Sequence, residues 1–175
     1  MPEALDPLPL LRALHERGIA YIVVGGFAVN AHGFIRVTKD LDIVPNPVRE
    51  NLQRLAAMLD ELGARVLDTG DFEPQELPAD PTRADDLAMG GNFCVLTDIG
   101  RLDVMQWLSG VDFDDLYAAL DPETIDSTVD GIPVRVCGLE HLRAMKRAAG
   151  RPEDLKDLER LGEGPAPAAQ DTPEG

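Results

Sequence analysis

The chain has 175 residues, 44% of them hydrophobic, which fits one domain with a sizeable core, and we expect residues 1–161 to form that domain. No apolar run approaches the roughly 20 residues that span a bilayer, and the N-terminus lacks the basic start and cleavage site of a signal peptide, so we expect a cytoplasmic protein with no membrane contact. The formal net charge of −16 works against unaided binding of a long polyanion, so any contact with nucleic acid must be local.

The first predicted elements are a helix, a strand and a second helix. Leucines at helical spacing predict a helix over residues 7–17, which Gly18 stops. The apolar residues 19–24 predict a buried strand. Gly25 and Gly26 end this strand, and the small and apolar residues that follow predict a helix beginning directly after the turn.

A second strand, a helix and a long loop are predicted next. Residues 39–45 alternate in polarity, which predicts a strand whose polar face carries Asp40 and Asp42. Leucines along one side predict a helix over residues 48–63. Residues 68–91 are rich in Pro, Asp and Gly and show no period, which predicts a long loop.

The second half of the chain predicts strands followed by helices. Two strands are predicted within residues 92–108, and a hairpin within 128–138 with Asp130-Gly131 as its turn. Two helices are predicted within residues 139–162. The residues after them, 162–175, are expected to form a disordered tail.

The order of these elements indicates an α+β fold with α/β-like character. We expect helices packed against one mixed β-sheet, followed by a short helical C-terminal extension. The core of the domain is expected at about residues 18–110, and the C-terminal hairpin and helices at 125–161.

Several residues are assigned structural roles. Cys94 and Cys137 lie in β-like apolar stretches without metal-ligand spacing, so we expect buried free thiols and neither zinc nor a disulfide. Trp107 could stack on a base but is assigned to the core. Three acids are interpreted as favouring the start of a helix through its dipole: Asp112, Asp114 and Asp115.

The Gly25-Gly26 turn is a possible anion site. A strand that turns through glycine into a helix presents free backbone N–H groups and the positive end of the helix dipole, which suit a phosphate. An ordinary tight turn is the alternative, and it is the favoured interpretation of a glycine pair taken alone.

Three acids predict a metal site. Asp40 and Asp42 project from the same face of a strand and repel each other, and a divalent cation would convert that repulsion into coordination. An exposed polar face is the alternative for this pair alone. Asp103 sits in an apolar strand, where a carboxylate needs a partner. If the two strands are neighbours, the acids converge as two metals would require to activate a hydroxyl and stabilise pyrophosphate.

Taken together, Gly25-Gly26, the Asp40-Leu41-Asp42 pair and Asp103 resemble the signature of the nucleotidyltransferase superfamily related to DNA polymerase β. The stretches "RVTKDLDIV" and "LRAMKRAAGRPEDLKDLERL" resemble a bacterial subgroup. That subgroup includes small uncharacterised nucleotidyltransferases and toxins of abortive-infection and toxin-antitoxin systems. Many members carry a serine at the glycine turn, whereas Phe27 follows Gly26 here, so phosphate binding would rest on backbone groups.

The resemblance implies transfer of a nucleoside monophosphate from an NTP to a hydroxyl, with release of pyrophosphate. It implies that Mg²⁺ or Mn²⁺ is held by the residues that carry catalysis, Asp40, Asp42 and Asp103. It further implies a nucleotide site formed by Gly25, Gly26, Arg36, Thr38 and Lys146, with Asn30 as a possible helper. A small-molecule transferase and a non-catalytic nucleotide-binding or toxin-antitoxin module are the alternatives.

The acceptor is open between RNA or tRNA and a small molecule, and a toxin-like member would have a cognate antitoxin as partner. The only local cationic stretch carries Arg143, Lys146, Arg147 and Arg151 without an acid among residues 143–151. It is either a phosphate- or RNA-facing stripe or a solvated helix face paired with nearby acids. The toxin-like resemblance favours RNA.

Overall fold

The computed structural model describes residues 4–67, 79–111 and 115–162. The predicted tail after residue 162 lies outside the described residues, as do Asp112, Asp114 and most of the first half of the predicted loop 68–91. Within the described residues, every helix is too short or too polar to cross a bilayer.

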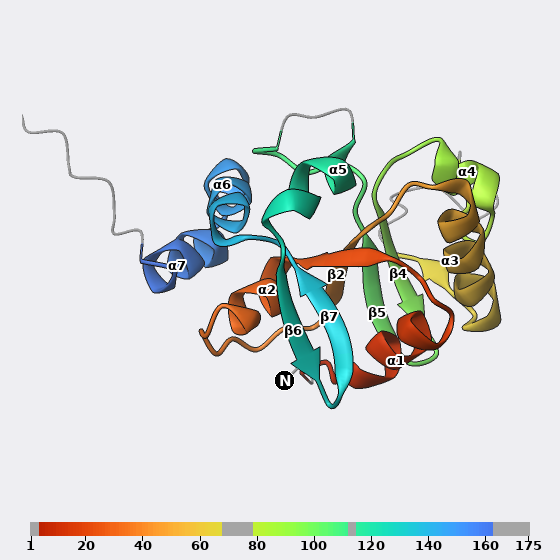
Figure 1. Cartoon of the computed structure of the whole chain (residues 1–175), viewed down its shortest axis with the longest axis horizontal. Helices are drawn as coiled ribbons and strands as arrows, with labels where there is room; N and C mark the ends of the chain where they lie inside the picture. The colour runs from red at the N-terminus through yellow and green to blue at the C-terminus, as the bar shows by residue number, and fades with distance from the viewer. Residues whose placement is uncertain (1–3, 68–78, 112–114, 163–175) are drawn as a thin grey trace, which may run out of the picture.

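Seven strands form a single sheet. They are β1 (Tyr21–Val24), β2 (Leu41–Pro45), β3 (Arg65–Val66), β4 (Phe93–Thr97), β5 (Gly100–Val104), β6 (Ile125–Val129) and β7 (Ile132–Val136). Their order across the sheet is β3-β4-β5-β2-β1-β7-β6 (Figure 1). The pairs β2–β5 and β1–β7 are parallel and the other pairs are antiparallel, so the predicted mixed sheet is confirmed.

Seven α-helices surround the sheet in the described part of the chain. They are α1 (Leu8–Glu16), α2 (Gly25–Ala31), α3 (Arg49–Glu61), α4 (Ala84–Ala88), α5 (Leu116–Leu120), α6 (Leu139–Ala149) and α7 (Pro152–Arg160), and a short 3₁₀ turn (Asp121–Glu123) follows α5. Helix α1 contacts β5, β7 and α3, whereas α5 contacts β1 and β2. Helices α6 and α7 lie together at one end of the molecule, beside α2, and α3 and α4 lie at the other end (Figure 1).

The pairing of β2 with β5 determines which side chains share a face. Leu41 lies opposite Leu102 and Asp42 lies opposite Asp103. Side chains opposite each other on neighbouring strands point to the same face, and successive residues alternate between faces. The leucines therefore enter the core on one face, where both are fully buried, and the two carboxylates emerge together on the other.

Most predicted elements are confirmed, with differences at their edges. Asp40 precedes β2 and is not part of that strand, and the predicted loop 68–91 contains α4. Leu87 of α4 is fully buried and α4 packs on α3, so long-range packing forms a helix that local composition does not indicate.

Trp107 is 64% exposed, so its assignment to the core is wrong. Asp115 caps α5 by accepting a hydrogen bond from the Ala118 N–H at 3.1 Å, as predicted.

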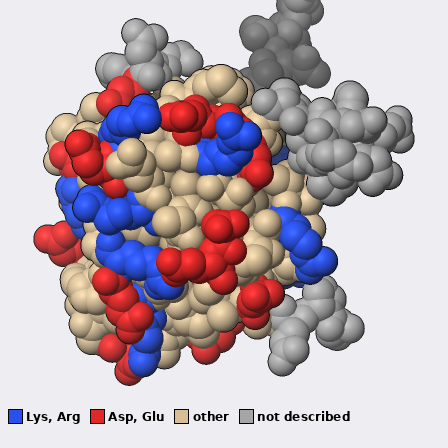
Figure 2. Space-filling model, turned by 90° about the vertical axis from the view of Figure 1, so that its right-hand side faces the viewer, with Lys and Arg blue, Asp and Glu red and all other residues tan. Residues whose placement is uncertain are grey.

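Acidic and basic side chains are intermixed on the end of the molecule that carries α3 and α4 (Figure 2). One ordinary pair there joins Arg49 of α3 to Asp85 of α4 at 3.0 Å, with both side chains mostly exposed. Exposed pairs of this kind contribute about 0–1 kcal/mol. This exposed pair is a reference for the contribution of the buried ion pairs around Lys146.

We expect the hairpin turn to depend on Gly131. Asp130 and Gly131 have φ values of 49° and 79°, the left-handed geometry of a type I′ turn. Gly131→Ala should lower the unfolding free energy by about 1–2 kcal/mol, whereas Gly131→Asn should cost less because asparagine tolerates that region. Urea unfolding of both variants measures the difference. Equal losses would show that backbone conformation is not the limiting factor.

Candidate functional site

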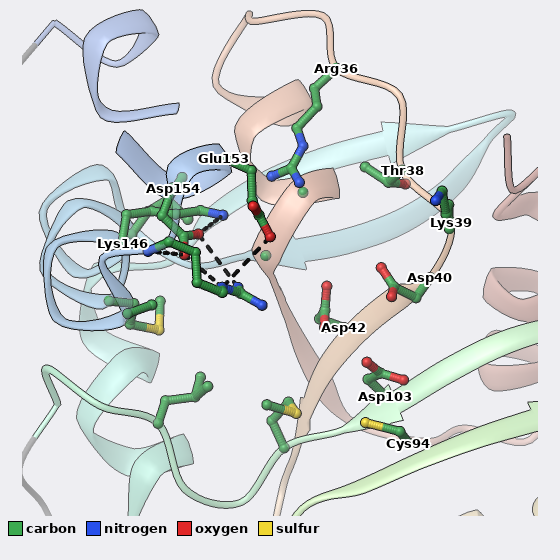
Figure 3. A pocket seen from close by; sticks show the side chains of 18 of the residues that line it. Arg36, Thr38, Lys39, Asp40, Asp42, Cys94, Asp103, Lys146, Glu153 and Asp154 are labelled. Atoms are coloured by element: carbon green, nitrogen blue, oxygen red, sulfur yellow. Dashed lines mark hydrogen bonds and ion pairs between the residues drawn. The ribbon is translucent and has the colours of Figure 1, made fainter. Parts of the chain in front are cut away.

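A cavity of about 520 Å³ opens where β2, β5, the loop before β2 and helices α6 and α7 meet (Figure 3). Its volume lies within the range of about 300–1,000 Å³ that small-molecule sites occupy. Its lining includes all eight residues that the sequence assigns to catalysis or nucleotide binding: Gly25, Gly26, Arg36, Thr38, Asp40, Asp42, Asp103 and Lys146. The fold thus brings these eight residues to one place.

The two glycines make room for side chains of the site. Gly25 has a φ of +67°, and a Cβ atom there would overlap the Asp42 carboxylate. A Cβ atom at Gly26 would overlap the Thr38 side chain. The sequence suggests close approach of a phosphate to this turn, but the structure shows close approach of Asp42 and Thr38. Both glycines are therefore needed to form the site before any ligand binds.

Three carboxylates gather at one end of the cavity (Figure 3). Asp42 and Asp103 face each other across the β2–β5 pairing, and Asp40 stands just before β2. Burial raises the pKa of Asp42 to about 7, and the negative charges of Asp40 and Asp103 add to that rise. Burial also raises the pKa of Asp103, which is only 6% exposed. The sequence-based prediction of convergence is thus matched by the geometry.

Arg101 is a site residue that the sequence argument did not single out. Its Nε lies 3.5 Å from Oδ2 of Asp40 and 3.3 Å from Oδ1 of Asp103. A second guanidinium nitrogen lies 3.4 Å from Oδ2 of Asp103. Arg101 precedes Asp103 by two residues on β5, so strand alternation puts both on one face, and that period could have identified it.

Cys94 also belongs to this end of the cavity. It lies opposite Asp103 on β4 and lines the cavity, so it is half-buried, and the prediction of a buried thiol holds only for Cys137. Burial and the nearby Asp103 charge raise the pKa of the Cys94 thiol to about 11. At neutral pH it is therefore a protonated thiol beside the carboxylate, and no thiolate ligand is present.

The residues of this cluster fit a divalent cation by their chemistry. Carboxylate oxygens are the ligands that Mg²⁺ and Mn²⁺ prefer. Asp42 forms no side-chain hydrogen bond or ion pair within the described residues, and a cation beside it would offset the repulsion from the other two acids. Among those same residues, no three acidic, histidine or cysteine side chains already stand in a metal-binding arrangement. Arg101 contacts Asp40 and Asp103 instead.

Thr38 carries a buried hydroxyl at the wall of the cavity. The residue is 7% exposed and lines the cavity, yet its Oγ1 has no hydrogen-bond partner among the described residues. Buried polar groups are nearly always hydrogen-bonded to protein or to ordered water, so this hydroxyl has a donor left for a small movement toward the cavity to use.

Asn30 positions the loop that carries Thr38. Its side-chain Oδ1 accepts a hydrogen bond from the Arg36 N–H at 2.7 Å, and its Nδ2 donates to the Arg36 carbonyl at 3.0 Å. Both ends of the amide are thus used within the protein. Asn30 therefore orients the loop, and because its Nδ2 has a second hydrogen, the phosphate contact that the sequence suggests stays a prediction.

Lys146 lies in a buried ionic cluster on the wall formed by α6 and α7. It is 6% exposed, and its Nζ stands 3.0 Å from carboxylate oxygens of both Asp154 and Asp157. Arg151 donates to Asp154 at 2.8 Å, and Arg36 pairs with Asp157. Burial alone would raise the pKa of Asp154, but hydrogen bonds from Arg151 and Lys146 outweigh it and lower that pKa. The cluster joins α6, α7 and the loop of Thr38.

This cluster bears on the two interpretations of the cationic stretch. Arg143 pairs with Glu140 at 2.6 Å and also donates to the Leu161 carbonyl. Together with Lys146 and Arg151, it therefore has acidic partners, several of them on α7. Pairing with nearby acids is confirmed for these three residues, although Lys146 is buried and does not lie on a solvated face.

No protein-family model matches the chain, and no curated protein matches it. Several solved structures do match the chain. The lincosamide antibiotic adenylyltransferase LnuA superimposes with a TM-score of 0.59 at 12% identity, over 91% of this chain and 98% of LnuA. The Thermotoga maritima protein TM1012, named as a candidate nucleotidyltransferase, gives 0.54 at 17% identity over 91% and 96%. The antibiotic-resistance factor ANT(2'')-Ia gives 0.51 at 19% identity over 87% and 80%.

The chain has the nucleotidyltransferase fold. This confirms the fold that the glycine and aspartate motifs imply. Nothing in these likenesses separates the toxin-like subgroup from the rest, so that assignment stays a prediction. The three acids at the end of the cavity therefore belong to a chain with the nucleotidyltransferase fold.

Asp42 gives a prediction about stability and pH in metal-free protein. Its pKa of about 7 in the folded state lies above the ordinary value of 3.8, so the folded protein keeps a proton that the unfolded chain loses. Stability should therefore fall as pH rises from about 4 to about 7 and stay low above that. Asp42→Asn should be more stable than wild type by about 2–4 kcal/mol at pH 8, with the difference smaller at pH 5 and vanishing only below about pH 4.

Urea unfolding in EDTA at pH 5 and pH 8 measures this difference. Asp85→Asn, which removes an exposed acid, is the matched control and should show no such pH dependence. A destabilised Asp42→Asn at pH 8 would contradict the repulsion inferred from the geometry.

Lys146 gives a prediction about the buried cluster. Lys146→Met keeps most of the side-chain volume but leaves Asp154 and Asp157 without their shared cation, so it should cost about 3–5 kcal/mol of unfolding free energy. Arg160→Ala removes a half-exposed partner 3.4 Å from Asp157 and should cost less than about 1 kcal/mol. Denaturant unfolding compares the two. Equal, small losses would show that the cluster does not hold α6 and α7 together.

Proposed function

We propose that this protein is a metal-dependent nucleotidyltransferase, which moves a nucleoside monophosphate from an NTP to a hydroxyl acceptor and releases pyrophosphate. One observation carries the proposal. Asp40, Asp42 and Asp103 converge at one end of a cavity of about 520 Å³ in a chain with the nucleotidyltransferase fold. Three carboxylates that repel one another are costly to assemble, and a divalent cation is the ligand that offsets this cost.

The three acids would hold Mg²⁺ or Mn²⁺. When bound, the metal would neutralise charge on the triphosphate and stabilise the attacking and leaving oxygens. Asp103 has a raised pKa and lies nearly buried, which suits it to accept a proton from the acceptor hydroxyl. Its placement on β5 keeps it fixed relative to Asp42 through the strand pairing.

The part of the cavity next to the acids would bind the triphosphate. The Thr38 hydroxyl has no partner and would donate to a phosphate oxygen. The backbone N–H groups of Gly25 and Gly26 begin α2 and would add further donors. Arg36 and Lys146 line the same cavity and would contribute positive charge, although each already pairs with a carboxylate of α7. Phosphate binding therefore redistributes existing ion pairs.

For the acceptor, we propose a small molecule that carries a hydroxyl group. LnuA is an antibiotic adenylyltransferase, and ANT(2'')-Ia has been solved in complex with adenylyl-2''-tobramycin, so this fold accepts such molecules in those proteins. A free cationic stripe over α6 would add support for RNA, but Arg143, Lys146 and Arg151 of that stretch have acidic partners. RNA or tRNA, with a cognate antitoxin as partner, is the second candidate and rests on the toxin-like motifs alone.

Labelling experiments separate these acceptors. Each α-³²P-labelled NTP is incubated with Mg²⁺ or EDTA and with aminoglycosides, lincosamides or total RNA. Acid-soluble labelled product that forms only with Mg²⁺ and a small molecule supports the proposal. Label in an RNA band would show that RNA is the acceptor and would leave the proposed enzyme class unchanged. No labelled product with any acceptor or NTP would contradict nucleotidyl transfer.

Metal binding has its own test. In wild type, Mg²⁺ together with NTP should raise the melting temperature by mass action on the folded state. The double variant Asp40→Asn/Asp42→Asn should lose that rise. The control Asp85→Asn/Asp126→Asn removes two exposed acids and should keep it. A rise that persists in the first variant would place the metal elsewhere.

A further inference from the structure

We propose that the Arg101 guanidinium pairs with the acid cluster while no metal is bound, and that this pairing makes the binding of divalent metal depend on nucleotide. This inference rests on the proposed function, because it concerns the same three acids. It assigns a role to a residue that the glycine and aspartate motifs do not include.

The contacts of Arg101 carry the inference. Its Nε bridges one oxygen of Asp40 at 3.5 Å and one oxygen of Asp103 at 3.3 Å. These two residues belong to different segments, and the metal site would need both. The guanidinium is thus bound to the oxygens that would coordinate a metal, whereas Asp42 has no such partner within the described residues.

Arg101 is free to leave this position. Its side chain is 39% exposed, unlike Lys146, which is buried in its own cluster. It stands at the wall of the cavity and not beneath it. A long side chain anchored on a rigid strand can turn toward the cavity without moving β5, so its release needs no change of fold.

A metal ion that arrives alone meets two obstacles. It must displace the guanidinium from Asp40 and Asp103, and it then stands near a like charge that has lost its partners. Both effects weaken binding of the free ion. The cluster is therefore held together by an internal cation while no nucleotide is present.

A triphosphate removes both obstacles. Its oxygens offer the guanidinium a new anionic partner, for which the planar fork of arginine is suited. The metal can then take the carboxylates while Arg101 pairs with phosphate. Because linkage is reciprocal, nucleotide should tighten metal binding and metal should tighten nucleotide binding by the same factor.

The alternative is that Arg101 only reduces repulsion among the acids for the sake of stability. Both roles predict a stability change on substitution, so stability cannot distinguish them. The metal affinity measured without nucleotide does, because only the proposed role predicts that removing the arginine strengthens it.

The experiment measures protein-bound Mn²⁺ by equilibrium dialysis, in which Mn²⁺ held by the free analogue is equal on both sides of the membrane and is subtracted. Wild type, Arg101→Gln and Arg49→Gln are compared with and without a non-reactive α,β-methylene NTP analogue. Arg49→Gln is the matched control, since it removes the same charge from an exposed pair far from the cavity. Arg101→Gln should bind Mn²⁺ alone at least about tenfold more tightly than wild type. Its gain from added nucleotide should shrink by a similar factor, and the control should match wild type.

Each outcome has one meaning. An unchanged or weaker Mn²⁺ affinity in Arg101→Gln, with nucleotide-dependent Mn²⁺ binding intact in wild type, overturns the role of Arg101 alone. No Mn²⁺ binding in wild type, even with the analogue, overturns the metal-dependent function itself.

A measurement on wild type covers the case in which Arg101→Gln does not fold. In protein labelled with ¹⁵N-arginine, the Nε–H resonance of Arg101 should move when Mg²⁺ and the analogue are added together. Mg²⁺ alone at the same concentration should leave it in place. A full shift with Mg²⁺ alone would overturn the proposal.

Discussion

The pairing of β2 with β5 brings two carboxylates side by side, where their negative charges repel each other. Much of the surrounding structure offsets this repulsion. Like charges directly opposite each other on neighbouring strands destabilise a sheet. Here Asp42 and Asp103 occupy that relation, and Asp40 adds a third charge at the strand end. Gly25 leaves space for the Asp42 carboxylate, and Arg101 supplies a counter-charge to the other two acids. A polar neutral residue at any one of these positions would reduce the cost, and the retained acids therefore support the proposed divalent cation.

A second group of charges builds the opposite wall. Asp154 and Asp157 project from α7 into the space beside α6, where both surround Lys146. Asp157 also pairs with Arg36 of the loop before β2, and Asn30 fixes the backbone of that loop. The C-terminal helices therefore do more than extend the fold, because they set the position of the loop that carries Thr38. Loss of α7 would loosen the cavity on the side where phosphate is proposed to bind.

The sequence predicts elements well where the pattern is local. The hairpin at Asp130-Gly131 follows from turn residues, and the alternation around Asp42 follows from a period of two. The convergence with Asp103 was conditional on strand order, which local pattern does not determine. Arg101 was missed although the same alternation puts it on the face of Asp103.

Other features depend on partners far along the chain. The burial of Lys146 needs Asp154 and Asp157 from another helix, and the burial of Leu87 in α4 needs α3. The exposure of Trp107 is a further example. The Asn92 side chain donates to the Trp107 carbonyl and accepts from the backbone N–H groups of Gln106 and Trp107, which holds the backbone there while the Trp107 residue stays mostly exposed. Local propensity cannot indicate contacts of this kind, because they are decided by which surfaces the folded chain brings together.

The charge of the whole chain bears on why the site would need metal. A protein at −16 repels a triphosphate at long range, and four cations that line its cavity, Arg36, Arg101, Lys146 and Arg151, already have acidic partners. Adding an anion beside these four exchanges one anion for another and gains little. A divalent cation changes this balance, because it adds positive charge to the acids without removing any existing cation. The Arg101 guanidinium could then exchange its partners, the carboxylates of Asp40 and Asp103, for phosphate without losing an ionic contact. Under the proposed function, metal and nucleotide would thus each bind weakly alone and more tightly together, which is the physical basis for coupling them in one site.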